Sequence, residues 1–419
     1  MKKMVKVAAL AAMVLTVGFA ACQEEVPPYL VIEDIDDDED GIHGKVVVEV
    51  TDPAEVPAHV KIPNGIVAIG DFAFDDCTSL TSVTFAKGVT KIGSCAFRDC
   101  TSLKSVSIPK TVTKIDDNAF EGCIALASVT IAEGVTEIGS GAFEDCTSIE
   151  SVTIPNSVTK IDDNAFEGCT SLASVTIPKS VTKIGDDAFE GCTSLASVTI
   201  SNGVTSIGNQ AFGGCTSLAN VSIPNSVESI GEGAFRDCAS LASVTIPSSV
   251  TEIGDYAFCA CTSLARVTIP DSVTEINWSA FCGCTSLASV TIPSSVTEIR
   301  TYAFSDCTSL TSVTIAEGVT EIGISAFMRC TSLKSVVIPR GVTSIGVRAF
   351  FGSTSLASVS IPRSVTEIGS NAFANCNPNF KIQYDGTKAQ WKAISKGSNA
   401  YPTIGTFTVQ CTDGVVTER

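Results

Sequence analysis

The sequence predicts an α/β solenoid, in which about 14 repeats of 23 residues stack their strands into a parallel β-sheet. An Ala-Phe pair recurs every 23 residues without an insertion, from Phe74 to Phe373. A cysteine stands three residues after each of these Phe side chains, and Ser353 replaces it once. A run of alternating apolar residues completes every unit. A fixed period of this length is typical of small units that bury their apolar faces only against their neighbours.

Each unit is expected to contain two extended runs and one tight turn, as the unit 154–176 illustrates. In the run Leu-x-x-Val-x-Ile-Pro, Val and Ile point inward and alternate with outward residues. Pro ends this strand because it has no N–H to donate. Val-Thr-x-Ile forms a second short run on the opposite side, and Gly lets the chain turn after it. Ala-Phe-x-x-Cys has the spacing of one helical turn, with Phe and Cys facing the core.

The chain is strongly acidic, with a formal net charge of −18 at pH 7. The charge is uneven along the array. Residues 64–252 hold 10 basic and 22 acidic side chains, a net −12, whereas residues 253–376 hold 7 and 8, a net −1. Because so acidic a chain repels phosphate backbones, we expect no nucleic-acid partner.

The amino terminus predicts export. Residues 1–21 have the pattern of a signal peptide, in which lysines precede an uncharged apolar run. Its end, Phe19-Ala20-Ala21-Cys22, resembles a bacterial lipoprotein box, although Leu is usual at the position of Phe19. We therefore expect a lipid anchor at Cys22 that holds the protein at the cell envelope, on the outer membrane or cell surface. Ordinary cleavage near Ala21 would instead give a secreted or periplasmic protein.

Residues 22–41 are expected to form an acidic tether, because their run of Asp and Glu repels itself and stays solvated. Asp36, Asp38 and Asp40 match the start of a calcium loop, but Val47 stands at the twelfth position, where a bidentate Glu is needed. A solvated spacer and a calcium site are the two interpretations of this segment. Residues 42–61 follow as an N-terminal cap that contains strands.

The array is not expected to hold a catalytic, metal or cofactor site. Both histidines, His43 and His59, precede it. The cysteines of the ladder form no C-x-x-C pair, which favours small apolar packing over metal or disulfide chemistry. Paired acids such as Asp162 and Asp163 recur with the repeat and are expected to be solvated turn residues rather than general acids. We therefore expect a protein that is not an enzyme and uses no cofactor.

The repeat resembles the BspA-type leucine-rich repeat of the treponemal class, which has a 23-residue unit. The resemblance covers residues 60–384, and the leucine-rich repeat array is expected at 62–384. Residues 385–419 are expected to form a C-terminal cap that includes a helix at 388–394, a strand at 403–411 and a core residue, Trp391. The resemblance implies an exported surface protein that binds host or other proteins, for example in the extracellular matrix. A structural spacer or assembly scaffold of the envelope is the alternative. The ligand and the oligomeric state are not indicated.

One column of residues changes character late in the array. Just ahead of the ladder Phe, early repeats have small or acidic side chains, such as Asp186 and Asp187. From the ninth repeat the column becomes aromatic, apolar or basic, and exposed aromatic and Arg side chains are frequent interface anchors. We predict a protein-binding surface here, the late-repeat ridge; the alternative is that these side chains only cover gaps between turns or have drifted. The predicted ridge consists of Tyr256, Trp278, Arg300, Tyr302, Ile324, Val347 and Arg348.

Two further cysteines lie outside the ladder column. Cys259 and Cys282 each directly follow a ladder Phe and are 23 residues apart, so they belong to one outward column on adjacent turns. Neighbouring turns at about 5 Å fit the Cα separation of about 4.4–6.8 Å that a disulfide requires. Export would favour oxidation. We predict a Cys259–Cys282 disulfide, with two exposed free thiols as the alternative.

Overall fold

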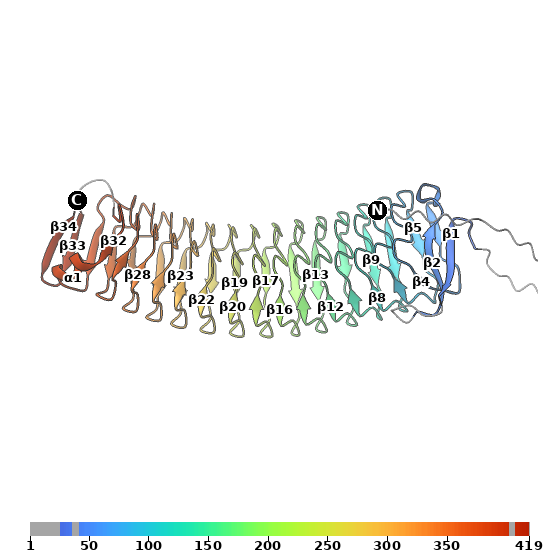
Figure 1. Cartoon of the computed structure of the whole chain (residues 1–419), viewed down its shortest axis with the longest axis horizontal. Coiled ribbons are helices and arrows are strands. Elements are labelled where there is room, and N and C mark those ends of the chain that lie inside the picture. Colours follow the sequence, from blue (N-terminus) through green and yellow to red (C-terminus); the bar gives the residue numbers. More distant parts are fainter. Residues whose placement is uncertain (1–25, 36–41, 402–406, 419) are drawn as a thin grey trace, which may run out of the picture.

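The structure is a computed structural model that describes residues 26–35, 42–401 and 407–418. The predicted signal peptide, the lipidation site Cys22 and the candidate calcium ligands Asp36, Asp38 and Asp40 lie outside the described residues. Figure 1 shows the chain as a long, shallow arc of stacked turns, with an N-terminal cap at one end and a C-terminal cap at the other. The predicted solenoid is therefore confirmed, with strand pairing in register from one repeat to the next.

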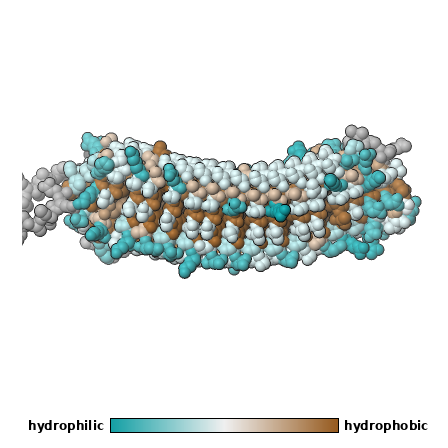
Figure 2. Space-filling model, turned by 180° about the vertical axis from the view of Figure 1, so that it is seen from behind, coloured by the Kyte–Doolittle hydropathy of each residue, from teal (hydrophilic) through white to brown (hydrophobic). Residues whose placement is uncertain are grey.

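The Val- and Ile-containing runs form the first column of parallel strands. Ser174, Val175 and Thr176 pair with the residues 23 positions later, and Val and Ile face inward between exposed Ser and Thr. Pale, weakly polar residues accordingly cover much of the face in Figure 2, where an apolar band also runs along the array. The strands are β3 (His59–Lys61), β5 (Ser82–Thr84), β7 (Ser105–Ile108), β9 (Ser128–Ile131), β11 (Ser151–Thr153), β13 (Ser174–Ile177), β15 (Ser197–Ile200), β17 (Asn220–Ser222), β19 (Ser243–Thr245), β21 (Arg266–Thr268), β23 (Ser289–Ile292), β25 (Ser312–Ile315), β27 (Ser335–Val337), β29 (Ser358–Ile361) and β31 (Lys381–Tyr384).

The short Val-Thr-x-Ile runs form the second column of parallel strands, as predicted. Each strand supplies one buried Ile to the core, for example Ile184, which pairs with Ile207. The strands are β4 (Ile66–Ile69), β6 (Lys91–Ile92), β8 (Lys114–Ile115), β10 (Glu137–Ile138), β12 (Lys160–Ile161), β14 (Lys183–Ile184), β16 (Ser206–Ile207), β18 (Ser229–Ile230), β20 (Glu252–Ile253), β22 (Glu275–Ile276), β24 (Glu298–Ile299), β26 (Glu321–Ile322), β28 (Ser344–Ile345) and β30 (Glu367–Ile368).

The strand pairing of both columns is interrupted at the same repeat boundary. In the first column β21 ends one sheet and β23 begins the next, and in the second column β20 ends one sheet and β22 begins another. We call this boundary the seam. One repeat earlier, the main-chain N–H of Gly254 donates to the carbonyl of Ile230 at 2.8 Å. At the seam the side-chain Nδ2 of Asn277 makes the corresponding bond to Ile253, at 2.9 Å.

The ladder Phe side chains form a continuous ring stack in the core. Successive ring centroids lie 5.0 Å apart at the start, for Phe74 and Phe97, and up to 5.5 Å apart later, with nearly parallel planes. From Cys100 onward, each ladder cysteine also donates its S–H to the Phe carbonyl of the preceding repeat, as Cys169 does to Phe143 at 3.2 Å. Ser353 makes the same contact with its hydroxyl, at 3.1 Å from the Phe327 carbonyl. The ladder cysteines are thus core residues with a hydrogen-bonding role.

The Ala-Phe-x-x-Cys segment is not the helical turn that its spacing suggested. Two residues in each copy have left-handed backbone angles, for example Asn164 with φ 60° and Gly168 with φ 68°. The N–H of Phe166 donates to Ala188 in the next repeat at 2.9 Å instead of closing a helical turn. The fold is therefore mostly β, and α1 (Lys388–Ala393) is the α-helix within the described ranges.

The N-terminal cap begins earlier than predicted. Residues Leu30–Ile35, placed in the acidic tether above, form strand β1, which pairs antiparallel with β2 (Gly44–Val50). β2 in turn pairs with β4, so β1 and β2 cover the open end of the second column. A 3-10 turn, η1 (Pro53–Glu55), joins β2 to β3. Alternating apolar residues at Leu30 and Ile32 pack on the core and explain why this stretch is not a solvated spacer.

The C-terminal cap closes the other end. Helix α1 has a capping box, in which the Thr387 hydroxyl accepts from the Gln390 N–H and the Gln390 side chain accepts from the Thr387 N–H. Trp391 is fully buried, which confirms it as a core residue. Three strands complete the cap: β32 (Ser395–Lys396), β33 (Phe407–Cys411) and β34 (Gly414–Glu418). No helix in the described ranges is long and apolar enough to span a membrane.

Candidate protein-binding ridge

The late-repeat ridge is carried by the first left-handed position of each turn and the residue before it. The main chain joins these positions across repeats: the Tyr256 N–H donates to the Trp278 carbonyl at 2.8 Å, and the Tyr302 N–H donates to the Ile324 carbonyl at 2.9 Å. In addition, the Asp255 carboxylate of one repeat accepts from the Trp278 N–H of the next at 2.9 Å. The ridge backbone is therefore fixed by the same hydrogen bonds that hold the turns together.

Large apolar side chains on this ridge are exposed. Trp278 is 52% exposed, Ile324 46% and Tyr302 40%. Tyr256 and Val347 also count among the exposed large hydrophobic residues. Five of the seven predicted ridge residues thus present apolar surface to solvent on successive turns, and grouped exposed apolar side chains are common at interaction sites.

Three ridge residues occupy a strained backbone conformation. Tyr256 has φ 57°, Tyr302 58° and Arg348 57°. An L-residue with a side chain loses roughly 1–2 kcal/mol in this region, whereas Gly loses none and Asn adapts with a local hydrogen bond. Asn164 and Gly141 suit this position sterically, although Phe72 and Gln210 also occupy it in early repeats. Tyr256, Tyr302 and Arg348 are therefore bulky side chains at a position that favours Gly or Asn, and such strain gathers at functional sites.

Arg300 lies apart from the other ridge residues. Its position corresponds to Asn277 in the preceding repeat and Gly323 in the next, and its N–H makes the usual bond to the Ile276 carbonyl at 2.9 Å. The guanidinium reaches the second strand column, where its Nη2 lies 2.7 Å from the Glu275 carboxylate. The guanidinium of Arg300 is therefore engaged in an ion pair with Glu275 on the face of the second strand column.

Residues next to the ridge extend its apolar and basic character. The Arg348 guanidinium lies 5.9 Å from the centre of the Phe351 ring. Arg329 is exposed, and its Nη1 lies 3.7 Å from the Asp306 carboxylate. Met328 and Phe351 occupy the position directly after the ladder Phe, the same column as Cys259 and Cys282. Sequence reasoning missed Met328 and Phe351, although the repeat register would have placed them here.

The same column is acidic in the early repeats. Glu121, Glu144, Glu167 and Glu190 follow their ladder Phe on four consecutive turns. Burial, together with the neighbouring carboxylates of Glu167 and Glu121, raises the pKa of Glu144 to about 7. Burial and Asp187 likewise raise the pKa of Glu190 to about 7. The turn surface therefore changes from acidic to apolar and basic along the array.

A second exposed aromatic stands at the start of the array. Phe72 occupies the same left-handed position as Tyr256, with φ 58° and an exposure of 52%. The Arg98 guanidinium covers its ring at 5.5 Å from the centre. Phe72 and Tyr256 occupy the same position in their repeats, so the 23-residue period could have identified Phe72 from the sequence. Because eight repeats separate Phe72 from the ridge, it does not belong to the same surface.

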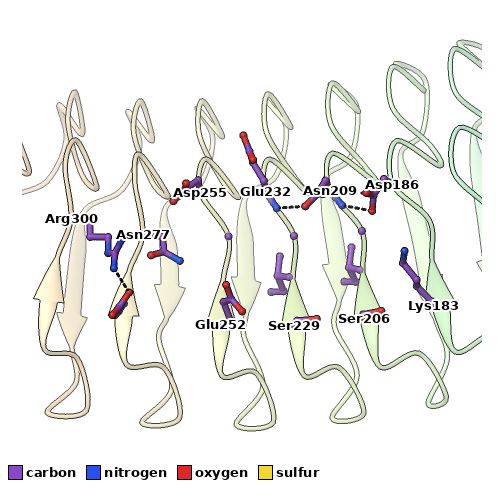
Figure 3. A pocket seen from close by; sticks show the side chains of 16 residues that line it. Lys183, Asp186, Ser206, Asn209, Ser229, Glu232, Glu252, Asp255, Asn277 and Arg300 are labelled. Atoms are coloured by element: carbon purple, nitrogen blue, oxygen red, sulfur yellow. Dashed lines mark hydrogen bonds and ion pairs between the residues drawn. The ribbon is translucent and has the colours of Figure 1, made fainter.

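A polar groove runs along the second strand column, below the turns, in the middle of the array (Figure 3). Its side chains bond to the main chain of the next repeat: the Asp186 carboxylate accepts from the main-chain N–H of Asn209 at 3.0 Å, and the side-chain Oδ1 of Asn209 accepts from the main-chain N–H of Glu232 at 2.9 Å. Figure 3 shows these bonds linking Asp186, Asn209 and Glu232 on consecutive repeats, with Arg300 further along the groove. The groove's polar groups thus serve the stacking of turns, which leaves little to recognise a ligand.

The remaining candidates are isolated polar contacts. The Nδ1 atom of His59 lies 2.8 Å from the Ser82 hydroxyl, a contact that the 23-residue register between them could have predicted. Cys259 and Cys282 are half-buried free thiols in the structure, and the disulfide between them stays a prediction. Within the described residues, no group of three or more His, Cys, Asp or Glu could hold a metal ion.

Comparison with known proteins identifies the repeat. A family model described as "BspA type Leucine rich repeat region" matches residues 58–173, 136–265 and 251–379. A leucine-rich repeat protein from Bacteroides ovatus ATCC 8483 is similar, at 30% identity over 92% of this chain and 99% of its own, with a TM-score of 0.79.

Two other solved structures share the repeat at similar identity. A leucine rich cell surface protein from Faecalibacterium prausnitzii A2-165 is 31% identical over 88% of this chain and 97% of its own, with a TM-score of 0.49. The leucine-rich repeat protein TpLRR of T. pallidum is 30% identical over 46% of this chain and 91% of its own, with a TM-score of 0.42. No curated protein matches. Because the family model matches well over half of the sequence, the chain belongs to the BspA-type leucine-rich repeat family.

Proposed function

We propose that this protein is an exported, envelope-anchored interaction module that binds another protein through the late-repeat ridge. The observation that carries the proposal is the pair Tyr256 and Tyr302, whose exposed rings stand on left-handed backbone positions. Stability alone favours Gly or Asn there. Exposed Tyr and Trp in one row supply the apolar contact area that binding hot spots use.

The ridge fits a partner with apolar side chains and a few acidic ones. Arg329 and Arg348 flank the apolar row, and the segment 253–376 has a net charge of only −1, from 7 basic and 8 acidic side chains. The early turns, with their column of Glu side chains, would repel an acidic partner. An acidic protein should therefore settle on the late repeats, and an extracellular matrix or serum protein is the class we propose.

The early repeats are suited to a spacer role within the same protein. Residues 116–123 and 162–169 are identical in sequence, and their outward strand positions are nearly all Ser or Thr. A uniform hydroxyl face offers little contrast for a specific ligand. We propose that these repeats hold the ridge away from the envelope, where a lipid on Cys22 anchors the chain. A scaffold with no binding partner is the competing function.

The test is a binding screen of the full chain against purified matrix and serum proteins. One variant combines Tyr256→Ser, Trp278→Ser and Tyr302→Ser. The matched control combines Ser substitutions of Asn164, Asp187 and Gln210, which occupy left-handed positions in early repeats.

We expect at least one panel protein to bind the natural chain and the control alike, and to bind the ridge variant at least about tenfold more weakly. Equal binding by all three proteins, with an intact circular dichroism spectrum, would exclude the ridge. Metabolic labelling with a fatty acid, compared between the natural chain and Cys22→Ser, tests the anchor separately.

A further inference from the structure

The seam between the ninth and tenth repeats is the place where the solenoid is held least by its strands. Both strand columns lose their pairing here, between β20 and β22 and between β21 and β23. The first column is also interrupted between β25 and β27, but the second column is continuous there. In a repeat stack, each boundary contributes its own nearest-neighbour free energy, so a boundary with fewer ladder bonds opens more readily.

Cys259 and Cys282 lie directly across this seam. Cys259 stands between β20 and β21, and Cys282 stands between β22 and β23. The main chain keeps the two turns together at this point, since the Ala260 N–H donates to the Cys282 carbonyl at 2.7 Å. Both thiols are free and half-buried, and they occupy the same outward column on the two turns that meet at the seam. In no other described boundary do two cysteines occupy this outward column.

We propose that Cys259 and Cys282 form a redox modification site, whose disulfide closes the seam and fixes Tyr256 relative to Trp278 on the ridge. The reagent class is a disulfide, either a small one such as oxidised glutathione or the active disulfide of an oxidoreductase. This inference concerns the seam and stands whether or not the ridge binds a protein.

The reaction balances as a two-step exchange. The Cys259 thiolate attacks one sulfur of the disulfide RSSR, which forms a mixed disulfide and releases RS⁻, which takes up a proton as RSH. Cys282 then loses its proton to solvent and attacks the Cys259 sulfur, which closes the cross-turn bond and releases a second RSH. The two cysteines lose two electrons and two protons in total, and RSSR gains them.

We assign the attacking role to Cys259 because of its neighbours. Interaction with the Cys282 thiol lowers the pKa of the Cys259 thiol, and the Arg236 guanidinium lowers it further. The same contact raises the pKa of Cys282, which keeps that thiol protonated until the second step. A thiolate beside a cation, with a second thiol at the same position on the next turn, is the arrangement expected of an attacking and a resolving cysteine.

The chain supplies a matched control pair two residues further on. Cys261 and Cys284 also lie on the two turns that face each other across the seam, but they are fully buried. Their S–H groups donate to the carbonyls of Phe235 at 3.1 Å and Phe258 at 3.2 Å. Burial raises the pKa of both thiols well above the usual value. They should therefore stay reduced under conditions that oxidise Cys259 and Cys282.

The experiment treats the folded full chain, carrying Cys22→Ser, with oxidised glutathione. We expect the intact mass to fall by two hydrogen atoms and a tryptic digest, cut after Arg266, to contain a Cys259–Cys282 crosslink that fragmentation assigns. Cys282→Ser should instead accumulate a stable glutathione adduct on Cys259. Cys259→Ser should react at least about tenfold more slowly, because it lacks the attacking thiolate. Free alkylation of both thiols after treatment, or a Cys261–Cys284 link formed equally fast, would overturn the proposal.

Hydrogen exchange gives a second, independent readout of the seam. In the reduced protein we expect faster amide exchange around Tyr256 and Asn277 than at the equivalent positions one repeat earlier. Oxidation should slow this exchange at least about tenfold in the natural pair and leave it unchanged in Cys259→Ser. Exchange that is equally slow at both boundaries before oxidation would show that no seam exists for the disulfide to close.

Discussion

The strain assigned to the ridge can be measured by changing only the β-carbon. We consider Tyr302→Gly and Tyr302→Ala, which both remove the ring and keep the N–H that donates to the Ile324 carbonyl at 2.9 Å. At φ 58° the Ala side chain meets the steric penalty of the left-handed region, and Gly does not. The difference between the two variants therefore isolates the backbone term from the lost ring contacts.

The expected difference follows from two opposing effects. Ala in the left-handed region loses roughly 1–2 kcal/mol. The Gly variant loses about 0.4–1 kcal/mol of stability relative to Ala for a different reason, because an unfolded chain with Gly has more conformations to lose on folding. The Gly variant should thus be more stable than the Ala variant by about 0.5–1 kcal/mol. At Ile324, a neighbour that is not among the residues with positive φ, the order should reverse, with Ala more stable by roughly 0.5–1 kcal/mol.

Urea unfolding followed by circular dichroism supplies the comparison, with the slope m checked so that only changes at constant m are interpreted as stability. If the stack does not unfold in one step, native-state hydrogen exchange of the tenth to twelfth repeats measures the change in their local free energy of opening. An Ala variant at Tyr302 that equals or exceeds the Gly variant would refute the strain, and with it the structural reason for assigning the ridge a function.

Three further outcomes are expected. Phe189→Ala should destabilise its region by about 3–5 kcal/mol and split the unfolding transition, because a stack loses its local coupling first; one transition shifted as a whole would contradict this. Ser353→Ala should lose about 1 kcal/mol by leaving the Phe327 carbonyl without its hydroxyl donor, whereas Ser353→Cys should restore it in thermal melts. Because the pKa values of Glu144 and Glu190 are raised to about 7 in the fold, their contribution to stability is largest below the normal Glu pKa and is lost as the pH rises through about 7. Gln at both positions should flatten the pH dependence of the urea midpoint between pH 5 and about 8, and an unchanged slope would contradict the assigned shifts.

The repeat register made the core of the fold predictable. Because the period never varies, one unit defines every strand, and the buried Phe and Cys columns follow from it. The turn was misjudged because Phe and Cys have helical spacing, although Asn164 and Gly168 are typical of left-handed positions and recur in that role. β1 was missed because its neighbouring Asp and Glu residues outweighed the alternating apolar side chains of Leu30 and Ile32.

The candidate site was predictable in position but not in detail. Register placed Tyr256, Trp278 and Tyr302 on adjacent turns, and their exposure agrees with that placement. The backbone strain, however, depends on φ, which periodicity does not reveal. Arg300 shows the other limit, since a long side chain can leave its column and reach a carboxylate on a different face, as it does at Glu275. The seam is likewise a property of strand pairing in three dimensions.

The most direct test of the central claim is a footprint of the protein with its bound partner. Hydroxyl-radical labelling of the full chain, alone and with the tightest binder from the matrix and serum panel, reports the solvent exposure of each reactive side chain. We predict that Tyr256, Trp278 and Tyr302 lose most of their labelling in the complex, while Phe72, which has the same backbone position in the first repeat, keeps its own. Loss of labelling at Phe72 or along the early repeats, with Trp278 unchanged, would contradict the assignment of the ridge as the binding surface.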